Sequence, residues 1–146
     1  MNPYQHILCP VDFSVHCKKA VGRAAQLAKD YQAKLTLFHA VIYYPIEYTD
    51  DWVTPEYIIP IEDLQQRGEA SLAGFAERLG LAEVERFVEV ATASAKQEII
   101  RFAEEHKVDL IVLSSHARHG ISRLLGSTAN GVVHAAPCDV LTVRAK

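Results

Sequence analysis

The sequence has few cysteines, no excess of positive charge and no apolar run of membrane-spanning length. Only three of the 146 residues are cysteine, and their odd number and wide spacing argue against a disulfide framework or a zinc ribbon. The formal net charge is -3, so there is no global positive field for non-specific binding to nucleic acid. The first residues lack the pattern of a signal peptide. We therefore expect a cytoplasmic protein that binds neither nucleic acid nor a membrane, with any anion site being local.

The chain instead contains a regular alternation of strand and helix patterns. Apolar, β-prone runs predict five strands, at residues 6–12, 34–43, 84–90, 108–115 and 138–144. Helical spacing of apolar residues predicts four helices, after Ser14, over residues 61–79, after Ser94 and over about 127–135. This alternation predicts one α/β domain over residues 1–146, a doubly wound, Rossmann-like parallel sheet with helices on both faces. Residues 44–60, with clustered prolines and aromatics, predict a long surface loop.

Polar and small residues follow the first and fourth predicted strands and begin the last helix. In an open parallel sheet, ligands bind outside the carboxyl ends of the strands, where the strand order reverses. The helix start offers hydroxyl and backbone N–H donors, and a nearby arginine adds positive charge, so this position suits a phosphate. The candidate binding residues are Pro10, Val11, Asp12, Ser114, His116, Ala117, Arg118, Gly126, Ser127 and Thr128.

Several of these residues also have structural interpretations. Gly126-Ser127 is a good helix N-cap, and Asp12 suits a loop cap before the first helix. His116, His119 and His134 are not accompanied by a carboxylate or thiolate cluster, so they do not form a zinc signature and we predict no metal site. Both interpretations of the Gly-Ser pair and of Asp12 remain open at this point.

The sequence favours no catalytic centre. Residues Cys17 to Arg23 match the Cys-x5-Arg spacing of tyrosine phosphatases, but that motif requires a loop after a strand. Here it lies within the predicted first helix, with Cys17 on the apolar face, so we interpret Cys17 as a buried thiol. We also interpret His39 as a core histidine. Because no nucleophile-base pair, Walker lysine or paired carboxylates can be assembled, we predict that the protein is not an enzyme.

Motifs along the whole length of the chain resemble those of the universal stress protein family. The opening segment from His6 to Ser14 reads His-Ile-Leu-Cys-Pro-Val-Asp-Phe-Ser, and residues 35–39 read Leu-Thr-Leu-Phe-His. Residues 108–113 read Val-Asp-Leu-Ile-Val-Leu, and residues 136–144 read Ala-Pro-Cys-Asp-Val-Leu-Thr-Val-Arg. This resemblance implies a five-stranded sheet of order 3-2-1-4-5, a cytoplasmic role in stress response, a homodimer and, in one branch of the family, bound ATP.

The nucleotide motif of the ATP-binding branch is altered in this chain. That motif reads Gly-x-x-Gly, nine residues, then Gly-Ser or Gly-Thr. Ser114 and Ala117 stand at the first two glycine positions, and eight residues separate Ala117 from Gly126. In this respect the chain is similar to the branch typified by universal stress protein A, which is not regarded as an ATP binder.

Other positions match the pocket of the ATP-binding branch. By resemblance these are Pro10, Asp12, Gly126 and Ser127, and Ala40 falls where an apolar residue meets the adenine. One hypothesis is therefore a stress-response protein that binds ATP, with Mg²⁺, or another adenine nucleotide, with little or no hydrolysis. The alternative is a dimeric interaction protein with a vestigial pocket. Residues Val140–Val143 form an apolar strand at the end of the predicted sheet, which favours pairing with a second copy.

Overall fold

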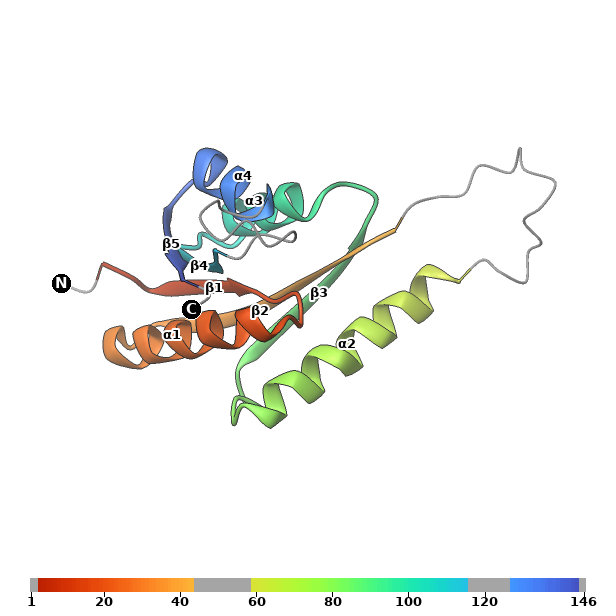
Figure 1. The fold of residues 1–146 in the computed structure, drawn as a ribbon, viewed down its shortest axis with the longest axis horizontal. Helices are drawn as coiled ribbons and strands as arrows, with labels where there is room; N and C mark the ends of the chain where they lie inside the picture. Colours follow the sequence, from red (N-terminus) through yellow and green to blue (C-terminus); the bar gives the residue numbers. More distant parts are fainter. Residues whose placement is uncertain (1–2, 44–58, 116–126, 145–146) are drawn as a thin grey trace.

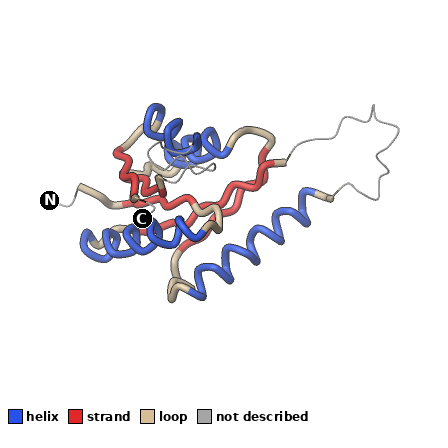
Figure 2. Tube along the Cα trace, in the orientation of Figure 1, coloured by secondary structure: helices blue, strands red, loops and turns tan. Residues whose placement is uncertain are grey.

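The computed structural model has a central sheet with helices on both faces (Figures 1 and 2). It describes residues 3–43, 59–115 and 127–144. The strands are β1 (His6–Pro10), β2 (Lys34–Ile42), β3 (Glu85–Ala91), β4 (Leu110–Ser114) and β5 (Asp139–Val143). The helices are α1 (Val15–Tyr31), α2 (Ile61–Arg78), α3 (Ala95–Glu105) and α4 (Ser127–Ala135). Strand and helix alternate throughout, as the sequence predicts.

The five strands are parallel and lie in the order β3-β2-β1-β4-β5. The predicted strand order is therefore confirmed. β1 is central, because Ile7 pairs with Leu35 on one side and with Leu110 on the other. The chain adds β2 and β3 on one side of β1 and then returns to add β4 and β5 on the other side. The order thus reverses between β1 and β4, and an open parallel sheet leaves a crevice for ligands at such a point.

Each face of the sheet has its own apolar core. Alternate residues of a strand point to opposite faces, so Ile7 and Cys9 face α1 and α2, whereas Leu8 faces α3 and α4. Small residues of α1, such as Ala20 and Ala24, are fully buried against the first face, which lets this helix lie close to the strands. Burial on both faces explains why β1, β2 and β4 read as nearly continuous apolar runs.

The helix ends follow from local capping. The Ser14 hydroxyl accepts a hydrogen bond from the Cys17 N–H at 3.2 Å, and the Ser94 hydroxyl accepts one from the Gln97 N–H at 3.3 Å. Both predicted N-caps are confirmed. After α2, Gly80 has φ 72°, and the carbonyls of the last turn accept hydrogen bonds from the N–H groups that follow, as is usual where a left-handed glycine ends a helix.

Several strands begin or end a few residues away from their predicted limits. The predicted first strand, residues 6–12, ends at Pro10, because the chain turns at Phe13, where φ is 63°. The predicted fourth strand, residues 108–115, begins at Leu110, because the Val108 N–H still bonds to the Ala103 carbonyl of α3. Residues 44–58 of the predicted surface loop lie outside the described residues.

Candidate site at the carboxyl edge of the sheet

The topology brings most of the described candidate residues to one edge of the sheet. β5 begins beside the start of β4, since Asp139 pairs with Leu110. The preceding helix, α4, therefore ends at the amino edge and begins at the carboxyl edge. β1 and β4 are adjacent parallel strands, so their carboxyl ends reach that same edge. Asp12, Ser114 and the start of α4 at Ser127 are thus placed around the reversal point between β1 and β4.

The loop between β1 and α1 carries Asp12 on a tightly bonded backbone. The Val11 N–H donates to the Phe38 carbonyl at 2.7 Å, which extends the pairing with β2 beyond the end of β1. The Ser14 N–H donates to Asp12 Oδ1 at 3.0 Å, and Ser14 in turn caps α1. Asp12 is exposed to solvent while Val11 is buried. The loop-cap interpretation of Asp12 is therefore confirmed, and Asp12 lies just beyond the carboxyl end of β1.

His39 of β2 contacts this loop through its imidazole ring. Its Nδ1 donates to the Val11 carbonyl at 2.7 Å, and its ring lies 4.5 Å from the ring of Phe13, measured between centroids. Phe13 also meets Phe75 of α2 edge to face at 5.6 Å. His39 is half-buried with a hydrogen-bonded ring nitrogen, in agreement with its interpretation as a core histidine. Its contact with the loop that bears Asp12 could not be found from sequence, because 26 residues separate it from Asp12.

The remaining described candidates lie around the same edge. Ser114 ends β4 and pairs with Val143, and the next residue, Ser115, donates its N–H to the Val143 carbonyl at 3.0 Å. Ser127 is exposed and Thr128 is half-buried at the start of α4. Ala40 packs against the core on the α3 and α4 face, and Pro10 is half-buried at the end of β1. Four candidates, His116, Ala117, Arg118 and Gly126, lie outside the described residues.

The cysteines have the environments expected of structural thiols. Cys17 is 2% exposed and lies within α1, not in a loop after a strand. Burial raises the pKa of the Cys17 thiol, and the negative charge of Asp12 raises it further. A phosphatase nucleophile requires a lowered pKa, so the interpretation of Cys17 as a buried thiol is confirmed. Cys9 is also fully buried in β1. Cys138, predicted within a strand, lies one residue before β5 and is partly buried.

Metal ligands do not gather in the part of the chain that the structure describes. Across residues 3–43, 59–115 and 127–144, no group of three or more His, Cys, Asp or Glu side chains is arranged to hold an ion. His134 of the candidate histidine group is exposed near the end of α4, at the far end of the helix from Ser127, and His119 lies outside the described residues. Within the same described ranges, no helix is long and apolar enough to cross a membrane.

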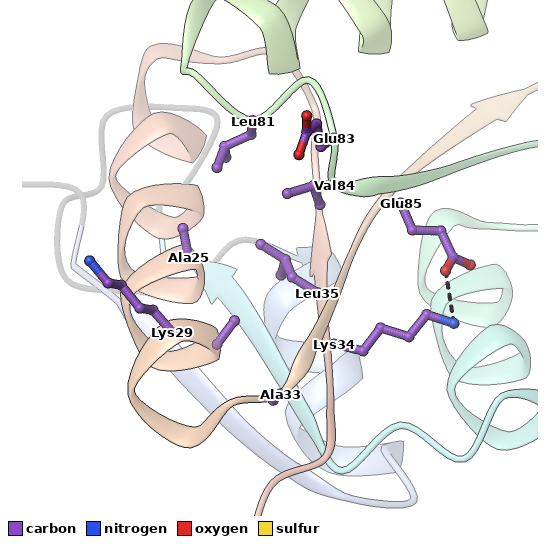
Figure 3. A pocket seen from close by; sticks show the side chains of 10 residues that line it. Ala25, Lys29, Ala33, Lys34, Leu35, Leu81, Glu83, Val84 and Glu85 are labelled. Atoms are coloured by element: carbon purple, nitrogen blue, oxygen red, sulfur yellow. Dashed lines mark ion pairs between the residues drawn. The ribbon is translucent and has the colours of Figure 1, made fainter.

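Two cavities lined by described residues lie away from this edge. A cavity of about 450 Å³ lies at the amino ends of β2 and β3 (Figure 3). Its floor is apolar, and its rim carries the ion pair of Lys34 Nζ and Glu85 Oε2 at 2.8 Å. A second hollow of about 770 Å³ lies between α2 and β3. Neither is lined by a candidate residue, so the site is defined by the strand ends and the α4 start and not by cavity size.

The comparisons with known proteins agree on one family. A sequence model described as the Universal stress protein family matches residues 3–144. The chain is similar to Universal stress protein A homolog 1 of Coxiella burnetii, with 34% identity over 148 residues, covering 96% of this chain and 96% of the relative. It is similarly 34% identical over 151 residues to homolog 2 of the same organism, covering 100% of this chain and 99% of the relative.

Solved structures show the same architecture. Universal stress protein UspA from Lactobacillus plantarum is 30% identical, with a TM-score of 0.68, covering 97% of this chain and 98% of that one. A universal stress protein in complex with cAMP is 26% identical, with a TM-score of 0.68, covering 98% of each chain. The strand order and the helices on both faces correspond to the fold of these neighbours.

Proposed function

Because the chain belongs to the universal stress protein family, we propose that it is a cytoplasmic stress-response protein whose single domain, residues 1–146, binds an adenine nucleotide. The proposed site is the carboxyl edge of the sheet between β1 and β4. The ligand is ATP with Mg²⁺ or another adenine nucleotide, and hydrolysis is slow or absent. A universal stress protein of the same fold has been solved with cAMP, which supports an adenine nucleotide as the ligand class.

One observation carries the proposal. β1 and β4 are adjacent and parallel, and α4 starts at their carboxyl edge, so Asp12, an exposed residue, and the exposed start of α4 at Ser127 lie around one reversal point. A helix start offers unpaired N–H groups to a phosphate, and a carboxylate accepts hydrogen bonds from ribose hydroxyls. This arrangement supports the proposal, because a nucleotide needs both of these chemistries at one site.

Each residue has a role in this proposal. Asp12 accepts from the ribose hydroxyls, and Ala40, on the same face as α3 and α4, contacts the adenine. Ser127 and Thr128 donate to the phosphates, and Gly126 allows the backbone to approach them. The other members of the proposed site are Pro10, Val11, Ser114, His116, Ala117 and Arg118.

Calorimetric titration of the purified protein with ATP and Mg²⁺ tests the proposal directly. A dissociation constant tighter than about 1 mM, equivalent to about -4 kcal/mol, supports it, and flat heats refute it. Asp12→Asn keeps an oxygen that can accept from the Ser14 N–H but removes the charge, and we expect it to weaken binding. Asp30→Asn is the matched control, because Asp30 is an exposed carboxylate that accepts a hydrogen bond from Gln26 near the other end of α1, so binding should not change.

A second candidate function is a dimeric interaction protein with a vestigial pocket. It is favoured by the altered glycine pattern at Ser114 and Ala117 and by β5, which pairs only with β4 among the described strands. We propose that a second copy pairs along Val140–Val143. Sedimentation velocity should then give the mass of a dimer, and Thr142→Lys, which puts a charge on this edge, should give a monomer with an unchanged circular dichroism spectrum. A dimer that persists in this variant would place the interface elsewhere.

A further inference from the structure

We propose that His39 is a positioning residue for the nucleotide site, because its imidazole fixes the backbone that presents Asp12 to the ribose. This inference rests on the proposed function. His39 belongs to β2 and not to the loop itself, so its role is to hold the site in shape. His39 lies on the opposite face of β2 from Ala40, the proposed adenine contact, so it contributes to ribose specificity without touching the adenine.

The loop is fixed on both sides of Val11. Its N–H donates to the Phe38 carbonyl at 2.7 Å, and its carbonyl accepts from His39 Nδ1 at 2.7 Å. Two adjacent residues of β2 therefore bind the two polar groups of one residue beyond the end of β1. The next peptide leads directly into Asp12, whose Oδ1 accepts from the Ser14 N–H at 3.0 Å. Asp12 thus lies between an anchor on β2 and the N-cap of α1.

The loop needs this anchor because its backbone is unfavourable at Phe13. Phe13 has φ 63°, a left-handed conformation that is disfavoured for residues with a β-carbon, and more so for bulky ones. Such a conformation persists only where the surrounding structure holds it. Two rings hold the Phe13 side chain, with centroids at 4.5 Å for His39 and 5.6 Å for Phe75. The His39 imidazole therefore supports both the carbonyl before Asp12 and the ring after it.

The imidazole itself has little freedom to move. A Cβ on Gly68 of α2 would lie 3.9 Å from His39 Cδ2, so α2 passes close over the ring. His39 is therefore fixed between β2, the loop and α2 before any ligand binds. A group that is already held in its binding geometry loses less conformational freedom when the ligand arrives, which improves affinity.

The consequence is a specific loss of affinity when the donor is removed. Without the hydrogen bond to the Val11 carbonyl, the loop can relax from the left-handed conformation at Phe13 and move the Asp12 carboxylate away from the ribose. The phosphate contacts at Ser127 and the adenine contact at Ala40 belong to other elements and stay in place. Removing His39 should therefore weaken only those ligands that carry ribose hydroxyls.

The test compares ATP–Mg²⁺ with 2′,3′-dideoxy-ATP–Mg²⁺ by calorimetry in the full chain. We expect His39→Leu to weaken ATP binding about fivefold, as for one lost hydrogen bond, and to leave dideoxy-ATP binding unchanged. His39→Asn can place its amide N–H near the position of Nδ1, so it should recover most of the affinity. In an Asp12→Asn background, His39→Leu should have a smaller further effect, because the carboxylate that it positions has already been replaced by a weaker acceptor.

Two further variants separate positioning from general destabilisation. Thr36→Val removes a hydrogen-bonding hydroxyl three residues earlier in β2, where Thr36 Oγ1 lies 2.8 Å from His6 Nε2, and ATP affinity should not change. Phe13→Gly relieves the left-handed strain and removes the ring contact. It should weaken ATP and not dideoxy-ATP, so the inference can be tested even where His39→Leu does not fold.

The outcomes distinguish the inference from the proposed function. Absence of ATP binding by the unaltered protein would overturn both. If ATP binds and Asp12→Asn weakens it, but neither His39→Leu nor Phe13→Gly does, the proposed function stands and the positioning role is wrong. An equal loss for ATP and dideoxy-ATP in His39→Leu would also overturn the positioning role, because it would show damage to the whole site.

Discussion

Replacing Gly68 with alanine should destabilise the protein, although alanine is the better residue for a helix. Gly68 is a buried residue of α2, and a Cβ at this position would lie 2.8 Å from Val88 Cγ1 and 3.2 Å from Val41 Cγ2. Val88 is 6% exposed. Both neighbours are β-branched, so their side chains have few alternative rotamers. The new methyl group can be accommodated only if α2 moves away from β2 and β3.

The size of the effect follows from two opposing contributions. Alanine is favoured over glycine by about 1 kcal/mol in a helix interior. Adding a methyl group to a well-packed core costs about 1–3 kcal/mol. The overpacking cost is larger here because a contact of 2.8 Å with a buried valine cannot be relieved by the movement of a flexible chain end. We therefore expect Gly68→Ala to lower the free energy of unfolding by about 1 kcal/mol.

Urea denaturation followed by circular dichroism measures this difference, and the same helix provides the control. A Cβ on Gly74 would meet only the flexible end of Arg78, at 3.6 Å from Nη1, so Gly74→Ala should raise the free energy of unfolding by up to about 1 kcal/mol. Val88→Ala should cost less in the Gly68→Ala protein than in the unaltered protein, because it removes the clash. If Gly68→Ala stabilised the protein as much as Gly74→Ala, the close approach of α2 to the sheet would be refuted.

Two further predictions concern pH and backbone conformation. Burial lowers the pKa of His6, whose ring bonds to the His106 carbonyl and to Thr36. Below about pH 6.5, His6 therefore takes up a proton in the unfolded chain at a pH where it stays neutral in the folded protein. The free energy of unfolding should therefore be level above that pH and fall below it, and urea titrations at several pH values should show a smaller fall in His6→Gln. Gln32 ends α1 with φ 54°, so Gln32→Gly should stabilise the protein by about 1 kcal/mol in the same assay, and an unchanged or lower stability would contradict this.

The sequence determined the order and type of the elements, because they depend on local patterns. Continuous apolar runs identified β1, β2 and β4, and Ser14 and Ser94 marked helix starts through hydrogen bonds that span three residues. The strand order followed from the family motifs of the sequence, which the register of β1 with β2 and β4 confirms. The exact strand ends were harder to predict from the sequence. The end of β1 depends on the left-handed conformation of Phe13, and an aromatic residue gives no sequence signal for that conformation.

Only the tertiary structure decided how the candidate site is supported. The sequence placed Asp12, Ser114 and Ser127 at a common edge, because parallel strands share their carboxyl ends. It contained no indication that His39 bonds to the Val11 carbonyl or that α2 approaches β3 closely at Gly68, since these contacts join residues far apart in the chain. Local patterns fix what each segment becomes, whereas contacts between segments arise only when β2, the loop after β1 and α2 pack against one another.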